Sequence, residues 1–123
     1  MNTVTWEIDD SGVFHLTLNR PKVHNAFNDE LIMELTVSLE KAAGEDGIRA
    51  LVLSGKGKSF SAGADLNWMQ VAADYSPEEN RADADRLAAM LHALDSFPVP
   101  TVAAVNGAAF GGGIGLVASC DIA

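Results

Sequence analysis

Apolar and polar residues alternate along the first part of the chain. Residues 4–9 and 13–19 carry apolar side chains at every second position, which is the period of a β-strand with one buried face. The stretch Asp-Asp-Ser-Gly at residues 9–12 lies between them and has the residue types of a tight turn. The pattern therefore predicts a β-hairpin, followed by a loop over residues 20–25.

From residue 28 the period becomes that of a helix. Asn28 is a favourable N-cap, and Gly44 is expected to end the helix. A further helix is predicted from the capping sequence Ser-Pro-Glu-Glu at residues 76–79 to about Phe97, before Pro98 and Pro100. The apolar stripe of the first helix comprises Leu31, Ile32, Leu35, Leu39, Ala42 and Ala43.

Two other apolar segments are predicted to be buried strands that lead into loops of small residues. Residues 49–55 precede a loop over 56–64 and a short helix near Asp65. Residues 101–105 precede an Asn-Gly turn and three consecutive glycines at 111–113. The order strand, loop, helix predicts an α/β fold with a partly parallel sheet, in which binding groups gather beyond the carboxyl ends of the strands.

The composition is that of a soluble globular domain. The chain has 123 residues, of which 48% are hydrophobic and 20% charged. Its single cysteine, Cys120, can form no internal disulfide, so a cytoplasmic location is expected. The first residues show no signal or transit peptide, and the N-terminus is expected to be mature.

The net charge of −9 argues against nucleic acids and anionic membranes as partners. Two stretches, residues 11–28 and 47–64, nevertheless contain no Asp or Glu. Either this spacing is chance, or these stretches bind a small polyanion. They hold five of the eight basic residues: Arg20, Lys22, Arg49, Lys56 and Lys58.

The uncharged segment 98–120 is long enough to cross a bilayer, and Gly107, Gly111 and Gly115 have the GxxxG spacing of membrane helices. Its prolines, glycines and Asn-Gly turn would leave backbone groups unpaired in lipid. No basic residues flank it to set an orientation. We therefore expect no membrane span.

The glycines match neither of two familiar nucleotide motifs. Leu116 stands where a dinucleotide fingerprint needs its last glycine, and Val52 where a phosphate loop needs its first. Glycines at a strand-to-helix turn can still expose N–H groups to a negatively charged ligand atom, and residues 61–65 form a second loop of this kind. Two such loops could form an oxyanion hole, or be tight turns with only a packing role. The residues alone leave both open.

Three stretches, NRPKVHNAF, FSAGADLNWM and AAVNGAAFGGGIGLVASCDIA, resemble signature stretches of the enoyl-CoA hydratase/isomerase (crotonase) superfamily in order and spacing. The resemblance runs from about Val4 to the last residue. It implies an α/β fold of repeated β-β-α units, of which residues 1–123 would form the N-terminal half of one domain. It also implies an acyl-CoA thioester substrate, assembly as homotrimers or dimers of trimers, no metal, and no cofactor apart from the coenzyme A of the substrate.

The resemblance also implies roles for individual residues. The backbone N–H groups of Ala64 and Gly112 would form the oxyanion hole for the thioester carbonyl. The remaining positions would bind substrate and coenzyme A: Lys22, His24, Ala26, Ala62, Gly63, Asp65, Leu66 and Gly111.

Two acid/base positions of the family hydratases depart from the pattern. Gly115 stands where those hydratases carry one catalytic glutamate, and the second glutamate would lie beyond Asp121, past residue 123. Asn67 replaces a lysine that would contact a coenzyme A phosphate. Within the superfamily the sequence looks most like the methylglutaconyl-CoA hydratases. A branched substrate in fatty-acid or leucine breakdown is therefore expected.

Other functions stay open at this level. The same oxyanion hole would serve an isomerase or other enolate chemistry, and the chain could be a truncated, non-catalytic acyl-CoA-binding fragment. An RNA-binding activity known in one relative is disfavoured by the acidic stretch 74–95. If another side chain acts as the base in place of the glutamate that is missing at position 115, the candidates are His24, Asp65 and Asp121. The remaining histidines, His15 and His92, are expected to be packed or surface residues. The tryptophans, Trp6 and Trp68, are expected to be packing residues.

Overall fold

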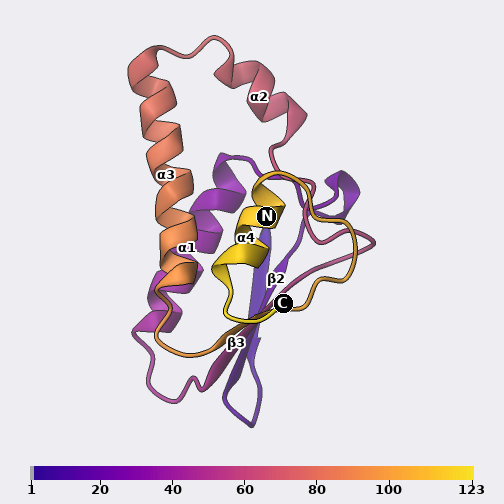
Figure 1. The fold of residues 1–123 in the computed structure, drawn as a ribbon, viewed down its shortest axis with the longest axis vertical. Helices are drawn as coiled ribbons and strands as arrows, with labels where there is room; N and C mark the ends of the chain where they lie inside the picture. The colour runs from indigo at the N-terminus through magenta and orange to yellow at the C-terminus, as the bar shows by residue number, and fades with distance from the viewer. Residues whose placement is uncertain (1) are drawn as a thin grey trace.

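A computed structural model describes residues 2–123 and contains one four-stranded sheet in the order β1-β2-β3-β4 (Figure 1). The first two strands form the predicted antiparallel hairpin, and the other two pair parallel to the second strand. The partly parallel α/β sheet is thereby confirmed. The strands are β1 (Val4–Ile8), β2 (Val13–Leu18), β3 (Ala50–Gly55) and β4 (Thr101–Ala103).

The helices begin at the predicted caps. The Asn28 side chain accepts from the N–H of Leu31, and Ser76 and Glu79 form a complete capping box. The last long helix ends at Asp95, slightly before the predicted Phe97, and the loop at 20–25 contains one turn of 3₁₀-helix. The helices are η1 (Pro21–Val23), α1 (Asp29–Ala43), α2 (Leu66–Ala72), α3 (Pro77–Asp95) and α4 (Gly112–Ser119).

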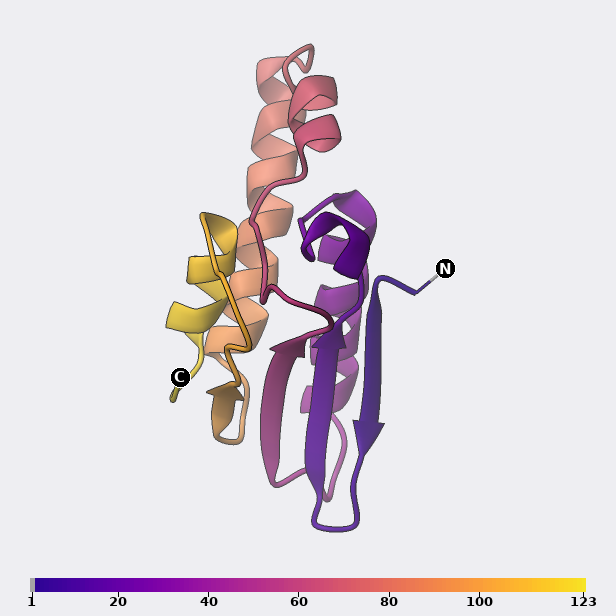
Figure 2. The same ribbon diagram turned by 90° about the vertical axis from the view of Figure 1, so that its right-hand side faces the viewer.

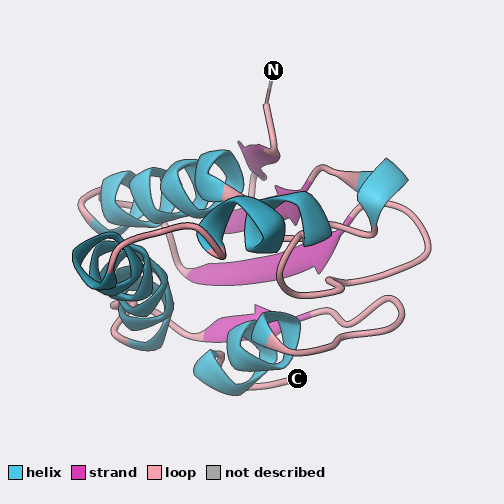
Figure 3. Ribbon diagram, turned by 90° about the horizontal axis from the view of Figure 1, so that it is seen from above, coloured by secondary structure: helices cyan, strands magenta, loops and turns pink. Residues whose placement is uncertain are grey.

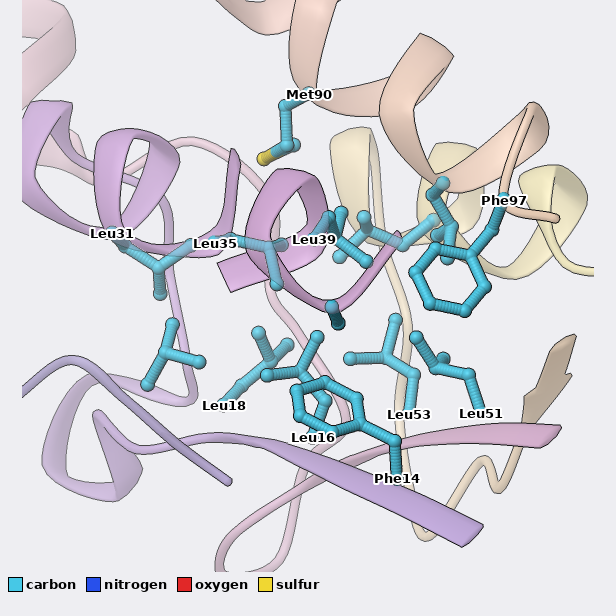
Figure 4. Close-up of a cluster of buried hydrophobic side chains, with 14 of the residues drawn as sticks. Phe14, Leu16, Leu18, Leu31, Leu35, Leu39, Leu51, Leu53, Met90 and Phe97 are labelled. Carbon is cyan, nitrogen blue, oxygen red and sulfur yellow. The ribbon is translucent and has the colours of Figure 1, made fainter. Parts of the chain in front are cut away.

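The core lies between one face of the sheet and α1. Alternate residues of β2 and β3 are buried, and those between them stay partly exposed. Figure 2 shows α1 behind the sheet, and α3 packs against both α1 and α4. In Figure 4 the leucines of α1 face those of β2 and β3, and side chains from α3 and the residues after it close the cluster. The labelled members are Phe14, Leu16, Leu18, Leu31, Leu35, Leu39, Leu51, Leu53, Met90 and Phe97.

The chain repeats one unit three times. Each unit is a parallel strand, a short bridging segment and a helix: β2 is followed by Phe27 and α1, β3 by residues 61–64 and α2–α3, and β4 by Ala109 and α4. The bridging segments pair with one another, Phe27 with Ala64 and Ser61 with Ala109. They therefore form a small second ladder beyond the carboxyl ends of the main strands, and the expected repeated β-β-α pattern is present.

Two local predictions are wrong. The fourth strand has three residues, because the chain leaves the sheet after Ala103 and the Asn106 side chain turns to accept the N–H of Gly55, 3.1 Å away. Trp6 is 59% exposed instead of packed in the core. It lies on the edge strand β1, where only one neighbouring strand supplies cover, and it stacks on Phe14 with ring centroids 5.6 Å apart.

Within residues 2–123 we find no helix with the length and apolar character needed to span a membrane.

Candidate active site

Three loops meet beyond the carboxyl ends of β2, β3 and β4, where Figure 3 shows them gathered past the arrowheads of the strands. The middle loop, residues 56–65, is bonded to both of its neighbours. On one side, the N–H of Phe27 donates to the Gly63 carbonyl at 2.6 Å. On the other, the N–H of Phe110 donates to the Ser61 carbonyl at 2.9 Å. The loop before α4, residues 108–112, holds the first two glycines of the 111–113 triplet. It is thus in direct contact with residues 61–65, the other small-residue loop that the sequence indicated.

The orientation of the Ala64 N–H follows from this ladder. Phe27 donates to the carbonyl of the residue before Ala64 and accepts, at 2.8 Å, from the N–H of Asp65 after it. In a parallel ladder, the residue flanked by two such bonds turns its own N–H to the other side. The N–H of Ala64 therefore points away from Phe27, toward the side occupied by the 108–112 loop.

The N–H of Gly112 lies on that same side. Gly112 is the first residue of α4, whose opening N–H groups have no acceptor inside the helix. A Cβ built on Gly63 would lie 3.2 Å from the Gly112 nitrogen, so the two loops touch next to Ala64. No acceptor among residues 2–123 takes the N–H of either Ala64 or Gly112. Two unpaired backbone donors from different loops are thus adjacent, one of them at a helix N-terminus that favours negative charge.

The glycines around these donors have a packing reason. A Cβ on Gly112 would lie 2.4 Å from the Phe27 ring, and one on Gly113 would lie 2.5 Å from the Ser61 carbonyl oxygen. Gly63, with φ of 84°, would clash with the Phe110 oxygen at 2.8 Å. Only Gly111 of the triplet faces open space, with φ of 51°. Close approach of the loops to one another, more than room for a ligand, thus explains why residues 112 and 113 are glycine.

Comparisons with known proteins support one family. Residues 9–123 match the sequence pattern described as enoyl-CoA hydratase/isomerase. The chain belongs to the enoyl-CoA hydratase/isomerase family. A crystal structure of an enoyl-CoA hydratase from Shewanella pealeana superposes with a TM-score of 0.95 and 42% identity, over 98% of this chain and 45% of that one. The crotonase-like fold is confirmed.

Two curated relatives differ in their named activities. A Mycobacterium bovis protein named "Probable enoyl-CoA hydratase echA6" is 43% identical over 89% of this chain and 42% of its own length. An Arthrobacter protein named 4-chlorobenzoyl coenzyme A dehalogenase-1 is 37% identical over 91% of this chain and 41% of its own length. The chain thus spans less than half the length of these relatives.

Gly115 occupies the position at which the family resemblance places a glutamate. Its nearest neighbours outside its own helix are the Leu91 methyl carbons, and a Cβ would lie 3.5 and 3.6 Å from them, an ordinary van der Waals distance. Unlike Gly112 and Gly113, Gly115 therefore has space for a side chain, and no contact in the structure requires a glycine there.

Two buried polar side chains that sequence reasoning missed hold the loops together. The Asn25 side chain accepts the N–H of Arg20 at 2.8 Å and donates to the carbonyls of Lys56 and Ser59, both at 3.0 Å. The Ser61 hydroxyl donates to the Asn25 carbonyl and accepts from the N–H of Gly63. Both side chains are fully buried. The φ of 55° at Asn25, which asparagine tolerates better than most residues, was not detectable from the sequence pattern.

An ion pair between Arg20 and Asp65 was also missed. Arg20 Nη2 lies 3.2 Å from Asp65 Oδ2, and the two side chains are 19% and 11% exposed. Asp65 also caps α2 by accepting the N–H of Trp68 at 3.1 Å. Burial alone would raise the pKa of Asp65, but the Trp68 N–H and the Arg20 guanidinium outweigh it, so the pKa lies below its ordinary value. The carboxylate is ionised and engaged within the protein.

The predicted coenzyme A residues are divided between surface and interior. Lys22, His24 and Leu66 are exposed, and the His24 Nδ1 lies 2.9 Å from the Ser59 hydroxyl. Ala62 is half-buried, whereas Ala26 is only 6% exposed and takes part through its carbonyl, which accepts from Arg20. The exposed members thus flank the contact between the 20–27 and 56–65 loops.

The basic residues of the two acid-free stretches do not all gather. Lys22, Lys56 and Lys58 are exposed on the two adjoining loops, and Gly57 lies against Pro21 between them. Arg49 lies at the opposite end of the sheet, where its N–H donates to the Gly12 carbonyl. The three exposed lysines, which we name the lysine corner, therefore lie on two adjoining loops of the site.

Two other candidate acids and bases, Asp121 and His15, have structural partners. The carboxylate of Asp121 accepts the N–H of Thr101 at 2.9 Å. His15 is paired with Asp9 at 3.0 Å on the surface of the hairpin, and His92 is exposed on α3. Trp68 packs against the core and donates its indole N–H to Asp29 at 3.0 Å. The site thus offers the N–H groups of Ala64 and Gly112 to a negatively charged oxygen. None of the contacts of Asp121, His15 or His92 places a base beside these two donors.

Proposed function

We propose that this chain supplies the thioester-binding half of a hydro-lyase that adds water to a 2-enoyl-CoA. The observation that carries the proposal is the pair of unpaired N–H groups on Ala64 and Gly112, one of them at a helix N-terminus. A thioester carbonyl oxygen placed between them would gain two hydrogen bonds. These bonds strengthen as the oxygen becomes negatively charged, which is the condition for catalysis instead of mere binding.

The chemistry follows from that placement. Water adds its oxygen to C3 of the enoyl group, and the electron pair of the C2=C3 bond moves into the thioester to form an enolate whose oxygen the two N–H groups stabilise. A base takes the proton of the water, and a proton is delivered to C2 to complete the 3-hydroxyacyl thioester. Because residue 115 is glycine, we propose that the acid/base carboxylate comes from outside residues 1–123.

The coenzyme A part of the substrate is assigned to the lysine corner. Its phosphates carry several negative charges, and Lys22, Lys56 and Lys58 are exposed cations next to the site on a chain with net charge −9. No separate cofactor is proposed. A branched, 3-methylglutaconyl-type acyl group and assembly as trimers or dimers of trimers remain part of the proposal, on the strength of the sequence resemblance alone.

A second candidate is another reaction through the same enolate, such as double-bond isomerisation. One relative is named as a dehalogenase of a coenzyme A thioester, which favours a shared site with varied chemistry. The glycine at 115, where a glutamate would distinguish a hydratase, leaves this candidate open.

The test follows the loss of enoyl-thioester ultraviolet absorbance with crotonyl-CoA and 3-methylglutaconyl-CoA, in protein that carries this chain together with the proposed carboxylate from outside residues 1–123. Ala64→Pro removes an N–H that bonds to no acceptor in the described part of the chain, and Ala64→Ser keeps it. Gly112→Pro is paired with Gly112→Ala, because both introduce the Cβ that meets Phe27 and only proline removes the donor. We expect each proline variant to lose about 100-fold or more in kcat relative to its partner. Equal rates within both pairs would refute the proposed role.

A further inference from the structure

No acceptor among residues 2–123 takes the Ala64 N–H, so its direction depends on the peptides on either side. Both are held by the backbone of Phe27, through the Gly63 carbonyl and the Asp65 N–H. The Ala64 donor is therefore only as well fixed as the contact between the 20–27 and 56–65 loops.

The Arg20 side chain spans that contact. One guanidinium nitrogen, Nη1, donates to the carbonyl of Ala26 at 2.5 Å, just before Phe27. The other, Nη2, lies 3.2 Å from the carboxylate of Asp65, just after Ala64. The guanidinium thus links the residue before Phe27 to the residue after Ala64, and so spans the pairing of Phe27 with Ala64.

We propose that the Arg20–Asp65 ion pair is a positioning element that fixes the direction of the Ala64 N–H, and this inference rests on the proposed role of that N–H in binding the thioester oxygen. The planar guanidinium suits the task because its two nitrogens make directed bonds at a fixed separation. A flexible ammonium has one nitrogen and can satisfy only one of the two partners well.

Burial makes the pair directional instead of a loose surface contact. The Arg20 and Asp65 side chains are 19% and 11% exposed, so water offers little competition for either group. The carboxylate divides its oxygens between two tasks, Oδ1 for the Trp68 N–H and Oδ2 for Arg20. Helix capping and loop positioning can therefore be separated by substitution.

Asp65→Asn is the variant that separates them. The asparagine amide oxygen can still cap α2, but the charge that holds Arg20 is lost. Arg20→Lys is the second variant, and it keeps the charge while removing the fork. Asp29→Asn is the matched control. Asp29 is also a carboxylate that accepts a hydrogen bond from Trp68, but it is exposed and makes no bond to the 56–65 loop.

The measurement is the backbone order parameter of the Ala64 and Gly112 amides by nitrogen-15 relaxation, without ligand. We expect Asp65→Asn to lower the Ala64 value from about 0.85 to below about 0.6. The Gly112 value should not change, Arg20→Lys should act in the same direction, and Asp29→Asn should have no effect. An unchanged Ala64 amide in both variants would overturn the inference. So would an equal fall at Ala64 and Gly112, since that would mean general loosening.

A second readout separates this inference from the proposed function. Acetoacetyl-CoA is a β-ketothioester whose enolate absorbs in the ultraviolet, and two N–H donors on its thioester oxygen would increase the enolate fraction of the bound ligand. We expect the ratio of enolate to keto form to fall about tenfold or more in Asp65→Asn, given the steep cost of small misplacements. If the unsubstituted protein shows no enolate, the proposed function fails, while the ligand-free order parameters still decide the positioning role.

Discussion

Two glycines of the same short helix should respond oppositely to the same substitution. Gly113 and Gly115 both lie in α4, so alanine at either position should gain about 0.5–1 kcal/mol of helix propensity. The surroundings differ. The new Cβ at 113 would lie 2.5 Å from the buried Ser61 carbonyl oxygen, whereas at 115 the nearest carbon is 3.5 Å away.

The difference between the two variants isolates the cost of that contact. Overpacking a buried site costs about 1–3 kcal/mol, and the 108–112 and 61–65 loops cannot separate without breaking their mutual hydrogen bonds. Gly115→Ala should therefore raise the free energy of unfolding by about 0.5–1 kcal/mol. The free energy of unfolding of Gly113→Ala should be lower than that of Gly115→Ala by about 1–3 kcal/mol.

Urea unfolding followed by far-ultraviolet circular dichroism measures both free energies under one set of conditions. Gly111→Ala serves as a third member, because its φ of 51° imposes backbone strain without any clash. If Gly113→Ala proved as stable as Gly115→Ala, the loop contact would not require the glycine, and the packing explanation of the triplet would be wrong.

Three other outcomes follow from the buried polar groups. The lowered pKa of Asp65 means that its stabilising effect is complete above the ordinary value of 3.8 and is lost as the pH falls through the folded value, so Asp65→Asn should flatten the acid limb of a stability–pH curve. Burial raises the pKa of the Cys120 thiol to about 11, so iodoacetamide at pH 8 should label the folded protein far more slowly than the urea-unfolded protein. Asn25→Ala should cost about 2–4 kcal/mol, because three part-buried hydrogen bonds from a fully buried side chain to the backbone are lost. Asn25→Gly, which tolerates the φ of 55°, should remain destabilised in the same unfolding assay.

Local sequence patterns predicted those parts of the fold that depend on local interactions. The hairpin turn, the Asn28 cap of α1 and the capping box at Ser76 each involve residues within a few positions of one another. The exposure of Trp6 was mispredicted, because alternation shows which face of a strand a residue occupies but not whether the strand lies at the sheet edge.

The candidate site could be predicted only in part, because it is built from contacts between distant loops. Small residues indicated where backbone donors would be exposed, and the loops around Ala64 and Gly112 do meet. The partners of Arg20 and Asn25 lie up to 45 positions away from them in the sequence, so no local pattern identifies these partners. Arg49 is likewise separated from the lysine corner because it precedes β3, whereas Lys56 and Lys58 follow that strand.

The most direct test of the account is a titration of the nitrogen-15-labelled protein with crotonyl-CoA, with free coenzyme A as the control, while the Ala64 and Gly112 amide resonances are observed. If both N–H groups bind the thioester oxygen, both amide protons should move downfield with crotonyl-CoA and neither should do so with free coenzyme A. Saturable binding of crotonyl-CoA without a shift at either amide, or with the same shifts for both ligands, would contradict the central claim.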